Sequence, residues 1–167
     1  ESKREIGCFL THMKAWQKVI DDDRPYYIFE DDARMKRKFT LPEGYDHVHL
    51  SARDMINHRW ASGKKGVVPI EGDFAGGFAY WTTPKAARYF MKKAIPIVTV
   101  ADYFMSQALM FNKELKSCIV APAPFGTGGR GTTIMHKFLF FPNLPRSNWF
   151  YFLLFSHSPL CEYAFPY

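Results

Sequence analysis

Apolar residues recur at helical spacing near the start of the chain. Over residues 5–20, one arc of a 3.6-residue helix is apolar except for a single glutamine: Ile6, Phe9, Leu10, Met13, Gln17 and Ile20. The pattern stops at "DDDRP", because Pro25 disfavours helix in the residue before it. We therefore predict an amphipathic helix whose apolar arc faces the core.

Short β-prone runs follow this helix. "YYIF" at residues 26–29 is apolar at every position, as expected of a strand that is buried on both faces. "HVHLSA" at 47–52 reads as a second strand, with His47 and His49 on one face that we expect to be partly exposed. The stretch "VVPIEGDFAGGFAYWTT" at 67–83 predicts one or two further strands around a glycine pair.

Two more helices are predicted between and after these strands. Thr83 is a favourable N-cap, Pro84 suits the first helical position, and "KAARYFMKKA" continues the helix. Another helix covers about residues 100–114, with five apolar residues on one face: Ala101, Phe104, Met105, Ala108 and Phe111. Because strands and helices alternate, the sequence predicts an α/β fold with a sheet flanked by helices.

The last part of the chain has a different pattern. Residues 138–167 are crowded with aromatic side chains, which need cover, and prolines interrupt them. No apolar run there reaches the roughly 18 residues that a membrane-spanning helix needs. We divide the chain into a domain at 1–137 and an unassigned tail at 138–167. We expect the tail to dock on the domain, on a partner or on a membrane surface.

Composition and charge narrow the function only slightly. The chain has 167 residues, the size of one domain, and a net charge of +6. This charge suits anionic partners without selecting one, and no interleaving of basic and aromatic residues predicts specific nucleic-acid binding. The three cysteines are far apart, which excludes a disulfide framework and zinc-finger spacing.

Three consecutive carboxylates follow the predicted strand at 26–29. Glu30, Asp31 and Asp32 fall at its carboxyl end, where ligands bind in open α/β sheets. In an extended chain Glu30 and Asp32 point one way and Asp31 the other, so two carboxylates can share a hard divalent cation. A solvated acidic turn after the strand is the alternative that the spacing leaves open.

The order of motifs closely resembles glycosyltransferase family 25. "EIGCFLTHMKAWQKVI" followed by "YYIFEDDARMKRKF" is similar to the family's helix pattern E-x-G-C-x-x-S-H and to its apolar strand that runs into E-D-D. Four residues match that helix pattern, and Thr11 replaces the serine: Glu5, Gly7, Cys8 and His12. "GGFAYWTTPKAARYFMKKA" and "VADYFMSQALMFN" are similar to the family's glycine-rich strand and to a segment with a further aspartate, here Asp102.

This family includes bacterial lipopolysaccharide galactosyltransferases and collagen hydroxylysine galactosyltransferases. The resemblance therefore implies a GT-A-like mixed sheet, a UDP-sugar donor that carries galactose, and Mn²⁺ or another divalent cation. It implies an acceptor that is a glycan, a lipooligosaccharide or a hydroxylysine. Implied roles are metal binding by Glu30, Asp31 and Asp32, and proton abstraction or substrate contact by Asp102. The implied substrate-binding residues are Glu5, His12, Gly76 and Gly77.

Structural roles remain open for several of these residues. Glu5 and His12 lie seven apart on one side of the helix and could be a boundary pair, while Gly76-Gly77 could be a bulge. Cys8 and His12, four residues apart, are too few ligands for a zinc site. Thr99-x-x-Asp102 resembles a capping box with Asp for Glu.

Relatives in the family begin with a strand and a helix upstream of the segment that opens this chain. We therefore expect a sheet that lacks the usual first strand-helix unit, which normally helps to hold the uridine. A non-catalytic remnant that acts as a binding or adhesion module is the alternative function. The expected location is cytoplasmic or membrane-associated for a bacterial protein, and the endoplasmic reticulum lumen for a eukaryotic one.

Overall fold

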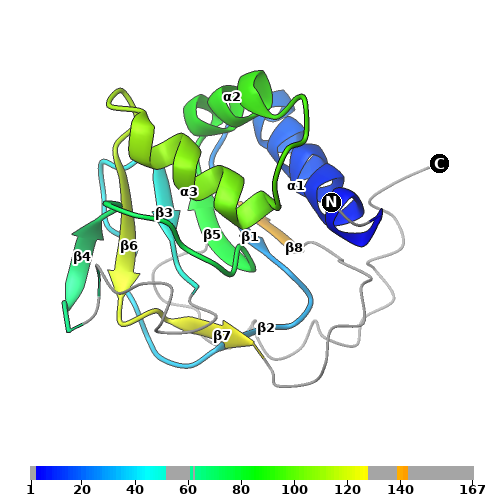
Figure 1. The fold of residues 1–167 in the computed structure, drawn as a ribbon. Coiled ribbons are helices and arrows are strands. Elements are labelled where there is room, and N and C mark those ends of the chain that lie inside the picture. The colour runs from blue at the N-terminus through cyan, green and yellow to red at the C-terminus, as the bar shows by residue number, and fades with distance from the viewer. Residues whose placement is uncertain (1–2, 52–60, 62, 128–138, 143–167) are drawn as a thin grey trace.

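The computed structural model describes residues 3–51, 61, 63–127 and 139–142 (Figure 1). Its helices are α1 (Lys3–Asp21), α2 (Pro84–Lys93) and α3 (Ala101–Phe111). Its strands are β1 (Tyr26–Phe29), β2 (Ala33–Met35), β3 (His47–His49), β4 (Gly66–Pro69), β5 (Ala79–Thr82), β6 (Ser117–Ala121), β7 (Phe125–Thr127) and β8 (Leu139–Pro142).

The main sheet is mixed and contains six strands in the order β4-β6-β3-β5-β1-β8. β3 and β6 are parallel, while β5 runs antiparallel to both β3 and β1. The carboxyl ends of β1, β3 and β6 therefore lie at the same edge of the sheet. We call this the carboxyl edge, and it is where ligands bind in open α/β sheets.

The three helices cover one face of the main sheet (Figure 1). β2, β7 and the segment after β2 lie at one end of the sheet and toward its other face (Figure 1). The larger core, on the helical side, includes Trp16, Tyr80, Phe90 and Met105. A smaller core around Phe29 packs against the β2–β7 side. The predicted α/β class is confirmed, and the mixed sheet flanked by helices is compatible with a GT-A-like fold.

Local signals located most of these elements. α2 begins where the sequence predicts, and the Thr83 hydroxyl accepts a hydrogen bond from Ala86 N at 3.3 Å. β2, β7 and β8 were not predicted. β8 lies in the segment assigned to the tail, and it pairs antiparallel with β1, with Phe29 opposite Leu139. The rest of 138–167 lies outside the described residues, so the boundary at 137/138 remains a prediction.

The predicted apolar arc of α1 faces the core only in part, through Phe9, Met13 and Ile20. Ile6 and Leu10 are 37% and 45% exposed, and the buried residues lie on a neighbouring arc: Phe9, His12, Ala15, Trp16 and Val19. Trp16 packs against Phe90 and donates to a buried tyrosine, so this large side chain sets the orientation of the helix. In the described part of the chain, no helix combines the length and apolar character needed to cross a bilayer.

Candidate functional site

Hydrogen bonds from the backbone and from the Ser51 hydroxyl tie three strands together at the carboxyl edge. Glu30 N, directly after β1, donates to Phe78 O at 2.9 Å. Ser51, just after β3, donates its hydroxyl to Gly76 O and accepts from Ala79 N at 3.3 Å. These bonds bring Glu30 next to the segment that carries the glycine pair.

Asp102 connects the amino end of α3 to this segment. Its Oδ2 accepts from Gly76 N at 2.8 Å, and its Oδ1 accepts from Tyr103 N at 2.9 Å. The N-cap of α3 is Val100, without a side-chain cap, so the capping box predicted from Thr99 does not form. Through its bond with Gly76 N, Asp102 instead holds the loop that carries the glycine pair.

The glycine pair is required by its surroundings. Gly76 has φ +92°, a backbone conformation that residues other than glycine rarely adopt. A Cβ on Gly77 would lie 2.9 Å from the Met105 Cε and 3.5 Å from the Asp102 Cβ. The structure thus brings together Gly76, Gly77 and Asp102, which the sequence singled out separately.

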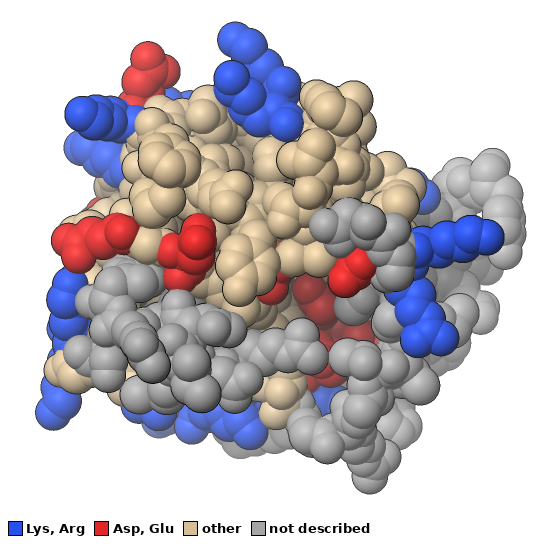
Figure 2. Space-filling model, in the orientation of Figure 1, with Lys and Arg blue, Asp and Glu red and all other residues tan. Residues whose placement is uncertain are grey.

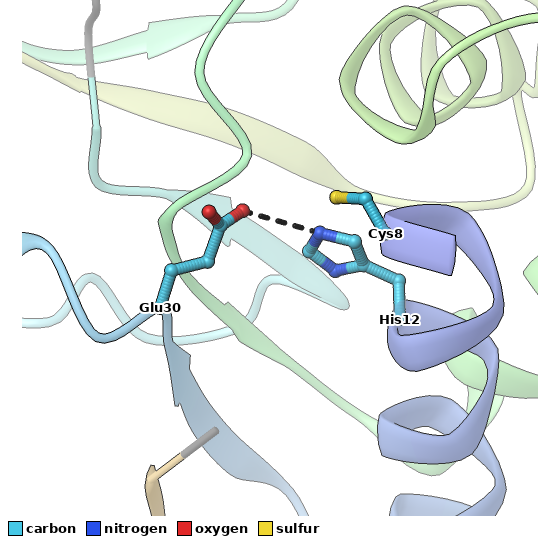
Figure 3. Close-up of side chains that lie close together, drawn as sticks. All are labelled: Cys8, His12 and Glu30. Atoms are coloured by element: carbon cyan, nitrogen blue, oxygen red, sulfur yellow. Dashed lines mark ion pairs between the residues drawn. The ribbon is translucent and has the colours of Figure 1, made fainter. Parts of the chain in front are cut away.

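A second group of side chains joins α1 to the end of β1. His12 is 1% exposed, and its Nε2 lies 3.3 Å from the Glu30 Oε1 (Figure 3). One ligand atom each from Cys8, His12 and Glu30 lies within 4.8 Å of the others. We call these three residues the Cys-His-Glu cluster.

Aromatic residues support the cluster from behind. The His12 Nδ1 lies 2.9 Å from the Tyr80 hydroxyl, to which Trp16 Nε1 donates at 3.0 Å. Burial alone lowers the pKa of His12, but its contacts with Tyr80, Cys8 and Glu30 outweigh burial and raise the pKa well above its ordinary value. Tyr80 is fully buried, so it is a core aromatic and does not offer an open ring face.

The three consecutive carboxylates do not lie along one extended strand. Residues 31 and 32 form a turn, in which Ala33 N donates to Glu30 O at 3.1 Å and the chain enters β2. Within the described ranges, Glu30 groups with Cys8 and His12 at metal-ligand spacing, and Asp31 and Asp32 are outside that group. Metal binding by Glu30, Asp31 and Asp32 remains a prediction.

The other predicted residues lie outside the Cys-His-Glu cluster or inside the core. Glu5 is exposed on α1, outside the Cys-His-Glu cluster. His47 and His49 are fully buried, so the expected exposed strand face is wrong. His47 stacks on Tyr80 with ring centroids 5.3 Å apart, and burial lowers its pKa to about 3.

Sequence reasoning missed Ser51 and the partnership of Tyr80 with His12. Ser51 lies 3.4 Å from the nearby His49 Nε2, but its backbone partners are 25 and 28 residues away, so no local motif reveals them. His12 lies on the buried arc of α1, but a pattern of apolar residues counts a histidine as a surface position. A buried tyrosine 68 residues away satisfies that histidine, and no spacing rule contains this information.

Figure 2 shows Asp and Glu side chains set back beneath the helical layer, with Lys and Arg mainly at the margins of the molecule. These features define the class of protein: it is an α/β domain with a mixed sheet and with polar groups gathered at the carboxyl edge.

The family model "Glycosyltransferase family 25 (LPS biosynthesis protein)" matches residues 2–64. The match over these residues confirms the resemblance to glycosyltransferase family 25 found in the motifs, and it covers less than half of the chain.

Two curated relatives illustrate the similarity. "Inactive glycosyltransferase 25 family member 3" of Homo sapiens is 29% identical over 99 residues, which cover 52% of this chain and 16% of the relative. "Putative glycosyltransferase" of Haemophilus influenzae is 27% identical over 134 residues, which cover 72% of this chain and 48% of the relative. The chain thus spans less than half the length of either relative. No solved structure gives a significant match.

Proposed function

We propose that this chain forms part of a glycosyltransferase that moves galactose from a UDP-sugar to an acceptor hydroxyl. The acceptor class is a glycan, a lipooligosaccharide or a hydroxylysine. One observation carries the proposal: Glu30, the Gly76–Gly77 pair and Asp102 are assembled at the carboxyl edge, although the sequence separates them widely. A sheet edge of this kind is the usual ligand crevice of an α/β fold.

The chain's own residues suit the binding of a sugar diphosphate. Gly76 and Gly77 have no side chains, so a sugar or phosphate can approach the backbone closely. Asp102 fixes this backbone through Gly76 N. Each carboxylate oxygen has a second lone pair, so Asp102 can also accept the proton of an acceptor hydroxyl within hydrogen-bond reach.

We further propose that Mn²⁺ or another divalent cation binds the acidic run of Glu30, Asp31 and Asp32. Carboxylate oxygens are the donors that hard cations prefer, so the chemistry of the run fits such an ion. Glu30 also lies 3.3 Å from the His12 imidazole, and Asp31 and Asp32 follow it directly in the turn that leads into β2. When bound, the cation would stabilise the charge of the leaving diphosphate.

The test uses the full-length protein that contains this chain, with UDP-galactose and a panel of acceptors. We expect UDP release that requires Mn²⁺ and that Asp32→Ala abolishes without changing the melting temperature. Asp21→Ala, which changes a carboxylate at the end of α1, should keep wild-type turnover. Wild-type activity and unchanged Mn²⁺ affinity in Asp32→Ala would remove Asp32 from the metal site.

A second candidate function is a non-catalytic binding or adhesion module. The names of several relatives favour it, because the human and mouse proteins are both described as "Inactive glycosyltransferase 25 family member 3". Such a module would bind a nucleotide sugar or a glycan without turnover. Binding on a glycan array, combined with no UDP release from any donor, would favour this function over transfer.

A further inference from the structure

We propose that the Cys-His-Glu cluster is a binding site for a transition-metal cation of the Zn²⁺ class. The site shares Glu30 with the hard-cation site proposed at the acidic run, but its other two ligands come from α1 and not from Asp31 and Asp32. Cys8 and His12 are four residues apart on α1 and so lie on one face of the helix. Glu30 reaches them from the end of β1, and one ligand atom from each residue lies within 4.8 Å of the others.

The distances suit a tetrahedral ion. Zinc bonds to imidazole nitrogen and carboxylate oxygen at about 2.0–2.1 Å, so two such ligands at a tetrahedral angle lie roughly 3.3 Å apart. The His12 Nε2 and the Glu30 Oε1 are 3.3 Å apart. The Cys8 sulfur lies within 4.8 Å of both atoms. A zinc-bound sulfur at about 2.3 Å from the ion would lie roughly 3.6 Å from them at a tetrahedral angle, so Cys8 completes the three-ligand set by moving no more than roughly 1 Å.

The histidine is oriented for ligation before any ion arrives. Tyr80 contacts the His12 Nδ1 at 2.9 Å and is itself fixed by the indole of Trp16. The Nε2 is thereby directed at Glu30 and Cys8. Metal-binding histidines are commonly oriented in this way by a hydrogen bond to their other ring nitrogen.

The arrangement differs from that of a cysteine nucleophile. In a nucleophile–base–acid relay, the cysteine and the carboxylate contact opposite nitrogens of the histidine ring. Here the Cys8 sulfur and the Glu30 carboxylate both lie on the Nε2 side (Figure 3). The Nδ1 lies 2.9 Å from the Tyr80 hydroxyl. Three groups converging on one point is the geometry of ligands around an ion.

The donor types select the metal. Thiolate and imidazole favour zinc and related transition metals, whereas Mn²⁺ and Mg²⁺ favour oxygen ligands. Three protein ligands leave a fourth tetrahedral position for water or another molecule. His12 is 1% exposed and the Glu30 side chain 12%, so the ion would sit largely shielded between α1 and the carboxyl edge.

The test titrates the metal-free, untagged chain with Co²⁺ and then with Zn²⁺. We expect one Co²⁺ per chain, an intense thiolate-to-cobalt absorption band, and displacement of Co²⁺ by Zn²⁺ with a rise in melting temperature. Cys8→Ser should remove the band, and His12→Gln should weaken binding at least about tenfold. Tyr80→Phe should weaken it about 10–100-fold, because it removes only the orienting contact.

Two control variants show whether the cobalt band and the bound metal belong to this cluster. Cys118→Ala changes a buried cysteine of the opposite core cluster and should keep the band and the one-to-one stoichiometry. Asp32→Ala should leave Co²⁺ and Zn²⁺ binding unchanged even though it abolishes the Mn²⁺-dependent transfer proposed above. A band that survives in Cys8→Ser, or that disappears in Cys118→Ala, would overturn the Cys-His-Glu site.

Discussion

Gly76 and Gly77 are needed for different reasons, although they are neighbours. Gly76 has φ +92° and gives its N–H to Asp102, so its backbone conformation is the constraint. Gly77 lies against Met105, so the space beside its Cα is the constraint. The pair therefore fixes how closely α3 approaches the carboxyl edge.

We predict that Gly76→Ala lowers the free energy of unfolding by about 1–3 kcal/mol, because alanine is strained in this backbone conformation. Gly7→Ala is the matched control, since Gly7 lies inside α1 and a Cβ there meets nothing within 4 Å. It should stabilise the chain by about 0.5–1 kcal/mol. Urea unfolding measures the stability of both variants. Equal stability of Gly76→Ala and wild type would mean that the backbone conformation of Gly76 is not a constraint.

His47 is a buried base whose two ring nitrogens have no hydrogen-bond partner among the described residues. Burial lowers its pKa from 6.5 to about 3, so the folded chain keeps the ring neutral where the unfolded chain protonates it. The stability that comes from keeping the His47 ring neutral is complete above pH 6.5 and is lost as the pH falls toward 3. Over this window the loss is about 1.4 kcal/mol per pH unit.

We predict that His47→Phe removes this contribution. Phenylalanine keeps the aromatic contacts with Tyr80 and Phe90 but binds no proton. Urea unfolding at pH 7.0 and 5.5 should show that the variant loses roughly 1 kcal/mol less than wild type on acidification. The same loss in both proteins would mean that His47 is already protonated, or accessible, in the folded chain.

At the scale of elements, β8 decides whether β1 is an interior or an edge strand. β1 carries the carboxylates at its end and pairs with β5 on one side and with β8 on the other. Without β8, the N–H and C=O groups on that side of β1 would be exposed, which favours aggregation. The strand that leads into the acidic run is therefore covered on one side by residues 139–142, far along the chain.

We predict that a chain ending at residue 137 is less stable and less soluble than one ending at 142. The two truncations differ only by β8 and the residue before it, so their difference isolates the β1–β8 pairing. Thermal unfolding and light scattering at equal concentration provide the measurement. Matching melting temperatures and scattering would mean that β8 adds nothing to the sheet.

At the scale of the whole molecule, Asp102 joins the stability of the fold to its proposed chemistry. Its two oxygens accept from two backbone N–H groups, Gly76 N and Tyr103 N. Asparagine has a single acceptor oxygen, so Asp102→Asn places an NH₂ group against one of these donors. An activity loss in this variant therefore has to be compared with its loss of stability.

We predict that Asp102→Asn in the full-length protein lowers galactose transfer by about 10²–10⁴-fold, the usual cost of losing a general base. Thr83→Ala is the control, because it removes the cap of α2 at the opposite edge of the sheet and costs about 0.5–2 kcal/mol. It should lower the melting temperature and keep the turnover. Near-wild-type transfer in Asp102→Asn would leave Asp102 with its loop-holding role alone.

The sequence by itself determined the elements whose signals are local. The helix before Pro25, the apolar strand 26–29 and the Thr83 cap are set by residues within one or two turns of each other, and the structure contains all three. The order of motifs also indicated the family. These features depend on side-chain spacing and backbone preference, which are present before the chain folds.

Only the tertiary structure decided which groups meet. It turned α1 so that His12 is buried against Tyr80, it brought β8 beside β1, and it placed Asp102 on Gly76. It also joined Glu30 to Cys8 and His12, a third ligand that the helix alone does not supply. These contacts depend on strand order and on polar groups that only distant partners can satisfy, so spacing along the chain does not contain them.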